Sequence, residues 1–121
     1  MLLNEKNDVW NRDWNDYAWS VYLPGDDGTL ANDWGVNLLR DPPLEIMDQI
    51  PPAYLQIHQR DILYDEGKMY GQRLQQQKKL AELVEVDTNH AGGLPPFSIG
   101  GPGERALEKA AQYIKSFLHE F

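Results

Sequence analysis

Cysteine is absent from the sequence, so the chain can form neither disulfide bonds nor thiolate metal sites. No apolar run is long enough to span a membrane. The first eleven residues do not show the basic and then apolar layout of a signal peptide. These absences predict a cytoplasmic protein without a membrane span.

Basic residues are scarce, above all in the first part of the chain. The 121 residues carry a net charge of −8, and their 41% hydrophobic content suits one globular domain. Residues 1–50 contain 10 acids, 3 bases and all four tryptophans, whereas residues 51–121 contain 9 acids and 8 bases. An acidic chain without a basic stripe is a poor candidate for binding nucleic acid. The composition divides the chain into an acidic, Trp-rich segment, 1–50, and a second segment, 51–121.

The first segment is predicted to be a helix followed by a loop. Apolar residues recur at helical spacing over residues 9–22, which predicts an amphipathic helix. These residues are Trp10, Trp14, Tyr17, Ala18 and Val21. A Pro/Gly/Asp turn cluster at 24–28 ends the helix, and residues 29–50 are expected to form a loop with a short helical turn.

The second segment alternates between strands and helices. The predicted elements are a strand at 53–59, a helix at 65–79, a strand at 80–86 and a helix at 104–121. This order implies a parallel strand pair joined by a right-handed crossover helix, so the fold class is α/β. A parallel sheet needs both faces covered, and two strands are too few for a stable open sheet. The chain is therefore expected to be part of something larger.

Both predicted helices of the second segment have features suited to packing on a sheet. Asp65 is the predicted N-cap of the first, and Gly67 and Gly71 would let its backbone approach the strands closely. Pro102 and Gly103 suit the start of the second. Its apolar stripe consists of Leu107, Ala110, Ala111, Ile114, Phe117, Leu118 and Phe121.

Two side chains suited to proton transfer follow the two predicted strands. Asp61 comes just after the first strand, and His90 follows the second in a Gly-rich loop. Loops after the carboxyl ends of strands form the sites of open α/β sheets, and adjacent parallel strands bring these ends together. Asp61 and His90 are therefore expected to meet. The two remaining histidines, His58 and His119, are expected to be structural or solvated.

A proline-led strand is followed by a distinctive acidic run. The sequence reads Pro51-Pro52-Ala53-Tyr54-Leu55-Gln56-Ile57 and then Asp61-Ile62-Leu63-Tyr64-Asp65-Glu66-Gly67. It resembles the "PPA-strand-D-x-L-x-D-E-G" segment of the hormone-sensitive-lipase-like branch of α/β-hydrolases. Tyr70 and Leu74 match the family's Y-x-x-x-L pattern on the next helix, and Trp14 to Pro24 resembles the helix ending in "W-x-x-Y-L" before the acid-bearing strand.

The resemblance covers roughly residues 10–121 and implies the C-terminal part of an α/β-hydrolase of the esterase/lipase kind. In that family the first Asp of the motif is the triad acid, which here is Asp61. The triad histidine follows the next strand, where His90 lies. A neutral histidine takes the serine proton, and the carboxylate fixes the histidine's tautomer and orientation. The implied substrate is a carboxylic ester, and no cofactor is expected.

The sequence departs from the family pattern in three places. Its serines are Ser20, Ser98 and Ser116. None lies in a G-x-S-x-G elbow, so the nucleophile and the oxyanion donors must come from elsewhere. His90 is followed by Ala91-Gly92 where the family usually has Gly-Phe. The acid-bearing strand is also less apolar than usual, because it holds Gln56 and His58.

The acidic run and the Gly-rich loop also fit roles outside a triad. Asp61 and Asp65 could simply cap the following helix. Residues 90–93 also resemble the H-G-G-G oxyanion loop of the same family, although that loop lies early in the fold and only 31 residues follow His90. A metal site built from Asp61, Asp65, Asp87 and His90 would have no recognisable ligand spacing.

Two hypotheses about function follow. In the first, the chain is a C-terminal fragment of a carboxylic-ester hydrolase, and a complementing chain or segment supplies the serine. In the second, it is a non-catalytic remnant or interaction module of the same fold. An upstream reading frame encoding H-G-G-G and G-x-S-x-G would favour the first hypothesis, and its absence the second.

Overall fold

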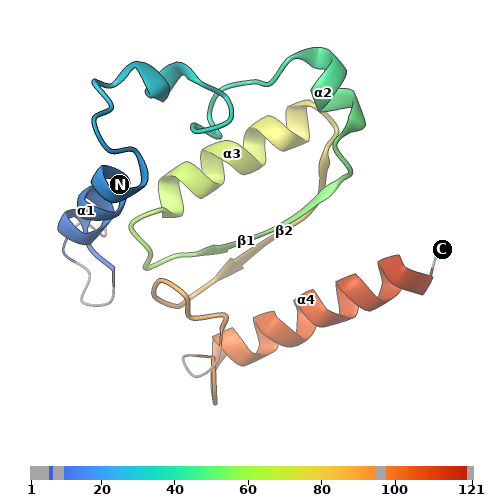
Figure 1. Cartoon of the computed structure of the whole chain (residues 1–121). Helices are drawn as coiled ribbons and strands as arrows, with labels where there is room; N and C mark the ends of the chain where they lie inside the picture. Colours follow the sequence, from blue (N-terminus) through green and yellow to red (C-terminus); the bar gives the residue numbers. More distant parts are fainter. Residues whose placement is uncertain (1–5, 7–9, 95–97, 120–121) are drawn as a thin grey trace.

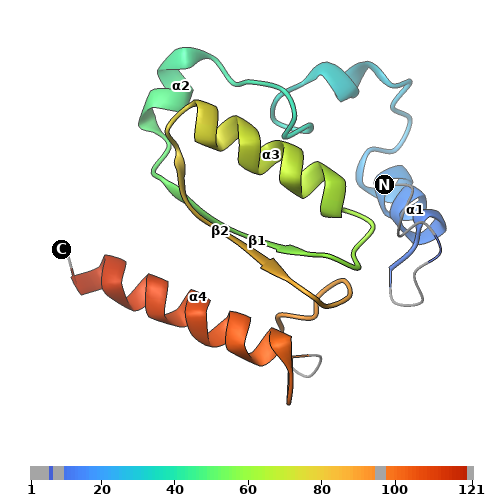
Figure 2. The same cartoon turned by 180° about the vertical axis from the view of Figure 1, so that it is seen from behind.

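The computed structural model describes residue 6, residues 10–94 and residues 98–119. Its elements are α1 (Arg12–Tyr22), the 3-10 helix η2 (Thr29–Asn32), α2 (Leu44–Gln49), β1 (Ala53–His58), α3 (Tyr64–Gln76), β2 (Leu80–Val86) and α4 (Pro102–His119). The two strands pair in parallel. Helix α3 lies over one face of this sheet and α4 over the other (Figures 1 and 2). The fold is the predicted α/β arrangement, and no described helix has the length and apolarity that a bilayer crossing requires.

The helix starts differ from the predicted ones for local reasons. Helix α1 begins at Arg12 because the Asn11 side chain accepts a hydrogen bond from the Trp14 N–H at 3.1 Å. Trp10 therefore lies before the helix. The predicted N-cap role of Asp65 is wrong, since the N-cap of α3 is Leu63 and Asp65 lies in the first turn. The Asp61 carboxylate accepts the Leu63 N–H, so the turn into α3 starts earlier.

The two glycines of α3 bring this helix close to β1, as predicted. A Cβ atom added to Gly67 would lie 2.7 Å from Cγ2 of Ile57, a buried residue of β1. A Cβ atom added to Gly71 would lie 3.2 Å from Cδ2 of Leu55, which is the far end of a flexible side chain. Helix α3 can therefore pack this closely on β1 only because Gly67 has no side chain.

Replacing Gly67 with alanine should destabilise the protein, whereas Gly71→Ala should be neutral or stabilising. Both changes gain helix propensity, but only the first forces a branched, buried side chain to move. Overpacking of this kind typically costs about 1–3 kcal/mol. Urea unfolding of the two variants beside the parent protein measures the difference. Equal stabilities for the two variants would contradict the close approach at Gly67.

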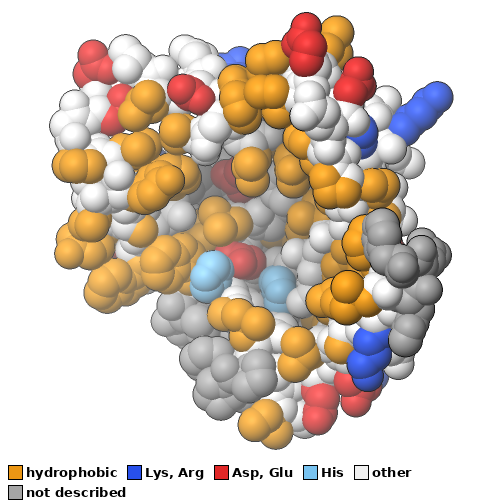
Figure 3. All heavy atoms as spheres, turned by 45° about the vertical axis from the view of Figure 1, so that its right-hand side comes forward, with side chains coloured by type: hydrophobic (Ala, Val, Ile, Leu, Met, Phe, Trp, Pro, Cys, Tyr) orange, Lys and Arg blue, Asp and Glu red, His pale blue; other side chains and the backbone are white. Residues whose placement is uncertain are grey.

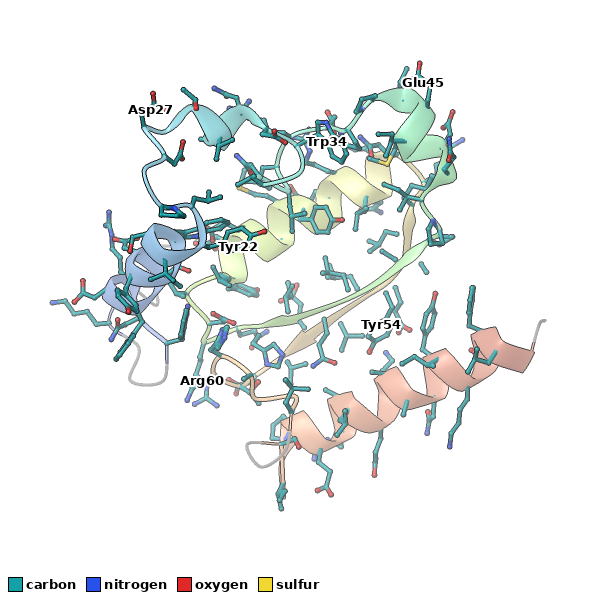
Figure 4. The ribbon with its side chains drawn as sticks, in the orientation of Figure 1. Tyr22, Asp27, Trp34, Glu45, Tyr54 and Arg60 are labelled. Carbon is teal, nitrogen blue, oxygen red and sulfur yellow. The ribbon has the colours of Figure 1, made fainter. Side chains whose placement is uncertain are left out.

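Helix α4 packs on the face of the sheet opposite α3 through aromatic and charged contacts. Tyr54 of β1 points toward this helix (Figure 4), and its ring lies 4.9 Å from that of Tyr113. Lys109 forms an ion pair with Glu82 of β2. The predicted apolar stripe of α4 is only partly covered. Its members Leu107, Ile114, Phe117 and Leu118 are all exposed, and Phe121 lies outside the described residues.

The segment between α1 and β1 is tied to the far end of α3. Asp41 forms an ion pair with Arg73 at 2.5 Å and accepts a hydrogen bond from Gln77 at 2.8 Å. The Lys79 ammonium donates to the backbone carbonyls of Asp48 and Ile50. These contacts hold the segment beside α3, with α1 at the opposite end near the start of that helix (Figure 1).

Candidate active site

Asp61 and His90 meet at the carboxyl ends of the two strands. The Asp61 backbone N–H donates to the His58 carbonyl at 3.0 Å, so the carboxylate sits in a tight turn directly after β1. Its Oδ2 atom lies 2.8 Å from Nδ1 of His90. The Asp61 side chain is 10% exposed and that of His90 is 32% exposed. The predicted contact is therefore present, with a buried acid behind a histidine that solvent can reach.

The contact fixes how the histidine carries its proton. The backbone N–H of Leu63 donates to Oδ1 of Asp61 at 3.0 Å, which holds the carboxylate in place. Oδ2 can then accept the Nδ1–H of His90, and this leaves Nε2 of the neutral ring as a proton acceptor. Within the described residues no hydrogen bond to Nε2 is formed. The pair can therefore act as an oriented general base.

A large hollow opens beside this pair. It has a volume of about 800 Å³ and is walled by α1, the loop after it, β1 and α3. Four consecutive residues of β1, Leu55 to His58, line it. Successive side chains of a strand point to opposite faces of the sheet, so a hollow lined by consecutive residues borders the edge of the strand. Asp61 and Glu66 also line it. In the space-filling view, histidine and acidic side chains lie in a hollowed face with hydrophobic groups around it (Figure 3).

The family model for the alpha/beta hydrolase fold matches residues 2–92. The chain belongs to this family. The matched stretch contains both Asp61 and His90 and stops before α4 begins. No curated protein and no solved structure matches the chain.

The loop that carries His90 in this hydrolase is held by close backbone contacts. A Cβ atom added to Gly92 would lie 2.5 Å from Thr88, and one added to Gly103 would lie 1.8 Å from the Gly92 carbonyl oxygen. The start of α4 is thus pressed against the loop. Ala91 takes a positive φ of 58°, a conformation that costs a residue with a side chain some strain. The Gly-rich sequence around His90 serves this packing.

Trp10 is a member of the site that the sequence does not predict. Its indole ring stacks on the His90 imidazole, with the ring centroids 5.1 Å apart and the planes inclined by 20°. The helical spacing of the tryptophans predicts Trp10 to lie on α1, whereas it precedes the helix. The Asn11 N-cap is the signal that could have separated Trp10 from the helix.

The serines and acids outside the pair do not add a recognisable catalytic group. The hydroxyls of Ser20 and Ser116 donate to carbonyls of their own helices, and Ser98 is buried. Among the described residues, no group of three or more His, Asp or Glu side chains could hold a metal ion. Residues 90–93, which resemble an oxyanion loop, follow β2, the last strand described in this hydrolase.

Proposed function

We propose that this hydrolase chain supplies the acid and the base of a carboxylic-ester hydrolase triad, with Asp61 as the acid and His90 as the base. The observation that supports the proposal is the 2.8 Å contact between Oδ2 of Asp61 and Nδ1 of His90. The serine would come from a separate segment or a complementing chain, since none of the 121 residues forms a G-x-S-x-G elbow.

The chemistry would run in two half-reactions. Nε2 of His90 takes the proton of the incoming serine hydroxyl as the oxygen attacks the ester carbonyl, and then gives this proton to the leaving alkoxide. The imidazolium that forms between these steps is stabilised by Asp61, which keeps its negative charge. In the second half-reaction His90 deprotonates the water that attacks the acyl-serine, and it returns this proton to the serine oxygen as the acyl–oxygen bond breaks and the carboxylic acid leaves. The backbone N–H donors for the oxyanion would come with the serine.

The hollow supports the idea that another segment completes the sheet. Within the described residues, β1 pairs only with β2, and its other edge faces the hollow. Oε2 of Glu66 is buried there without a hydrogen-bond partner among the described residues. A buried carboxylate oxygen without a donor is costly, and an incoming backbone or side-chain N–H would satisfy it. An added parallel strand would thus bring its carboxyl end beside Asp61 and His90.

A second function, that of a non-catalytic interaction module, is favoured by the same open edge. An uncovered strand edge is a template for pairing with another chain, with or without chemistry. The two functions differ in what happens when a serine-bearing partner binds. Only the first gives ester hydrolysis that depends on His90.

The purified chain alone should show no esterase turnover. Asp61 and His90 can orient and deprotonate a nucleophile, but attack by water without an oxyanion hole should be slow. Hydrolysis of a short p-nitrophenyl ester, compared with that by His90→Ala, measures this, and a fluorophosphonate probe reports any activated serine. Turnover at a rate typical of esterases that is lost in His90→Ala, or labelling of the chain by the probe, would show that the nucleophile lies within these residues.

A further inference from the structure

A second histidine, His58, lies beside the Asp61–His90 pair at the end of β1. Its Nδ1 atom is 2.5 Å from Oγ1 of Thr88, and its Nε2 atom is 3.2 Å from Nε2 of Gln56. The Gln56 amide nitrogen can only donate, so Nε2 of His58 must accept. The neutral ring then carries its proton on Nδ1 and donates it to Thr88. Both ring nitrogens are occupied, so His58 is not itself a base.

The contacts of His58 bracket the catalytic loop on both sides of His90. Thr88 lies two positions before His90 and bonds to the His58 ring. Gly93 lies three positions after it, and a Cβ atom added there would be 3.2 Å from Cε1 of His58 and 2.3 Å from Nε2 of Gln56. The backbone of the loop is also tied to the turn after β1, because the Arg60 N–H donates to the Thr88 carbonyl at 3.0 Å.

The surroundings of His58 favour its neutral form, and burial is the main cause. Burial lowers the pKa of His58, and this effect outweighs the attraction of the Asp61 carboxylate, which raises it. His90 also lowers the pKa of His58 through charge repulsion. The neighbours that contact the ring, Gln56 and Thr88, carry no charge. A neutral His58 therefore does not compete with His90 for the negative charge of the Asp61 carboxylate.

From this arrangement we infer that His58, through its hydrogen bond to Thr88, is a positioning residue that holds the loop of His90 so that Nδ1 of His90 meets Asp61. The inference rests on the proposed roles of Asp61 and His90. The sequence alone predicts only a structural or solvated role for His58, which together with Gln56 makes this strand less apolar than the family pattern.

Nuclear magnetic resonance of the full chain labelled with 15N-histidine tests the inference. We expect the Nδ1–H of both His58 and His90 to be hydrogen-bonded, to Thr88 and to Asp61 respectively. In Thr88→Val, which keeps the branched shape but loses the hydroxyl, exchange of the His90 Nδ1 proton with water should speed up about fivefold, the factor that one net hydrogen bond supplies. Thr88→Ser, which keeps the hydroxyl, should leave that exchange near the parent value.

A second pair of variants changes the other partner of this hydrogen bond, His58. His58→Asn keeps an amide N–H near the position of Nδ1, whereas His58→Phe keeps the ring but cannot donate. The His90 signal should persist in the first and be lost in the second. An unmoved His90 signal in folded Thr88→Val or His58→Phe would overturn the inference. So would unfolding of Thr88→Val while Thr88→Ser folds, because the bond would then hold the whole fold rather than the loop.

These spectra separate the inference from the proposed function. They need no serine and no turnover, so a completed enzyme without esterase activity would refute the proposed function and leave the spectra to decide about His58. Conversely, an unmoved His90 signal in the variants would remove the positioning role without touching the proposed roles of Asp61 and His90.

Discussion

Under the proposed function, adding a serine-bearing segment to the chain should produce ester hydrolysis, and His90→Ala should then lower kcat about 10⁴-fold or more. Loss of the base removes the group that takes the serine proton, and losses of this size are typical of triad members. Asp61→Asn should lower kcat to a similar extent, because an amide no longer favours the Nδ1–H tautomer that the 2.8 Å contact holds. The partner is a polypeptide carrying the H-G-G-G and G-x-S-x-G motifs, and the measurement is p-nitrophenyl ester turnover after mixing or fusion.

Asp65→Asn is the matched control for this experiment. Asp65 belongs to the same acidic run as Asp61 but lies in the first turn of α3, away from the contact with His90. It should leave kcat within a few-fold of the parent value. If Asp61→Asn and Asp65→Asn behaved alike, Asp61 would be a helix-start residue and not the triad acid.

The isolated chain should be marginally stable and should associate as its concentration rises. Ile62 is the only large side chain that is completely buried among the described residues, whereas many large apolar side chains are exposed. Trp14, Tyr22 and Leu118 are among these, with exposed fractions of 57%, 70% and 65%. A domain of this size has a stability of only about 5–15 kcal/mol when its core is complete. The open edge of β1 adds a site for pairing with another molecule.

Thermal unfolding together with size-exclusion chromatography at several concentrations measures this. We expect a broad transition, binding of an apolar-surface dye and an elution volume that falls with concentration. The net charge of −8 opposes association but cannot replace a core. A sharp cooperative transition from a strict monomer without dye binding would mean that the chain is a complete domain.

The elements that could be predicted from the sequence are those whose pattern is local and strong. The alternation of apolar residues predicts strand 80–86 with the bounds that the structure has. The placement of Asp61 and His90 after successive strands is enough to predict their contact, because parallel pairing aligns the ends of neighbouring strands. Their proposed roles depend on the family pattern, which composition and periodicity alone do not supply.

The features that could not be predicted depend on side chains from distant positions. Trp10 reaches His90 across 80 positions of the chain, and no periodicity encodes such a contact. The roles of Gln56 and Thr88 likewise appear only once β1 and the loop after β2 are adjacent. The predicted start of α3 is one residue late because Asp61, and not Asp65, accepts a backbone N–H at the turn into the helix.

The parallel pairing has a consequence for how the chain folds. Ala53 pairs with Leu80 and His58 with Val86, so every pair in the sheet closes a loop of similar length with α3 inside it. Asp61 and His90 close a loop of nearly the same span, 29 positions. The entropic cost of closing a loop grows only slowly with its length. Once the sheet has formed, the contact between Asp61 and His90 therefore costs little additional chain entropy. The two groups should therefore come together in the same kinetic step as β1 and β2, before the N-terminal segment docks.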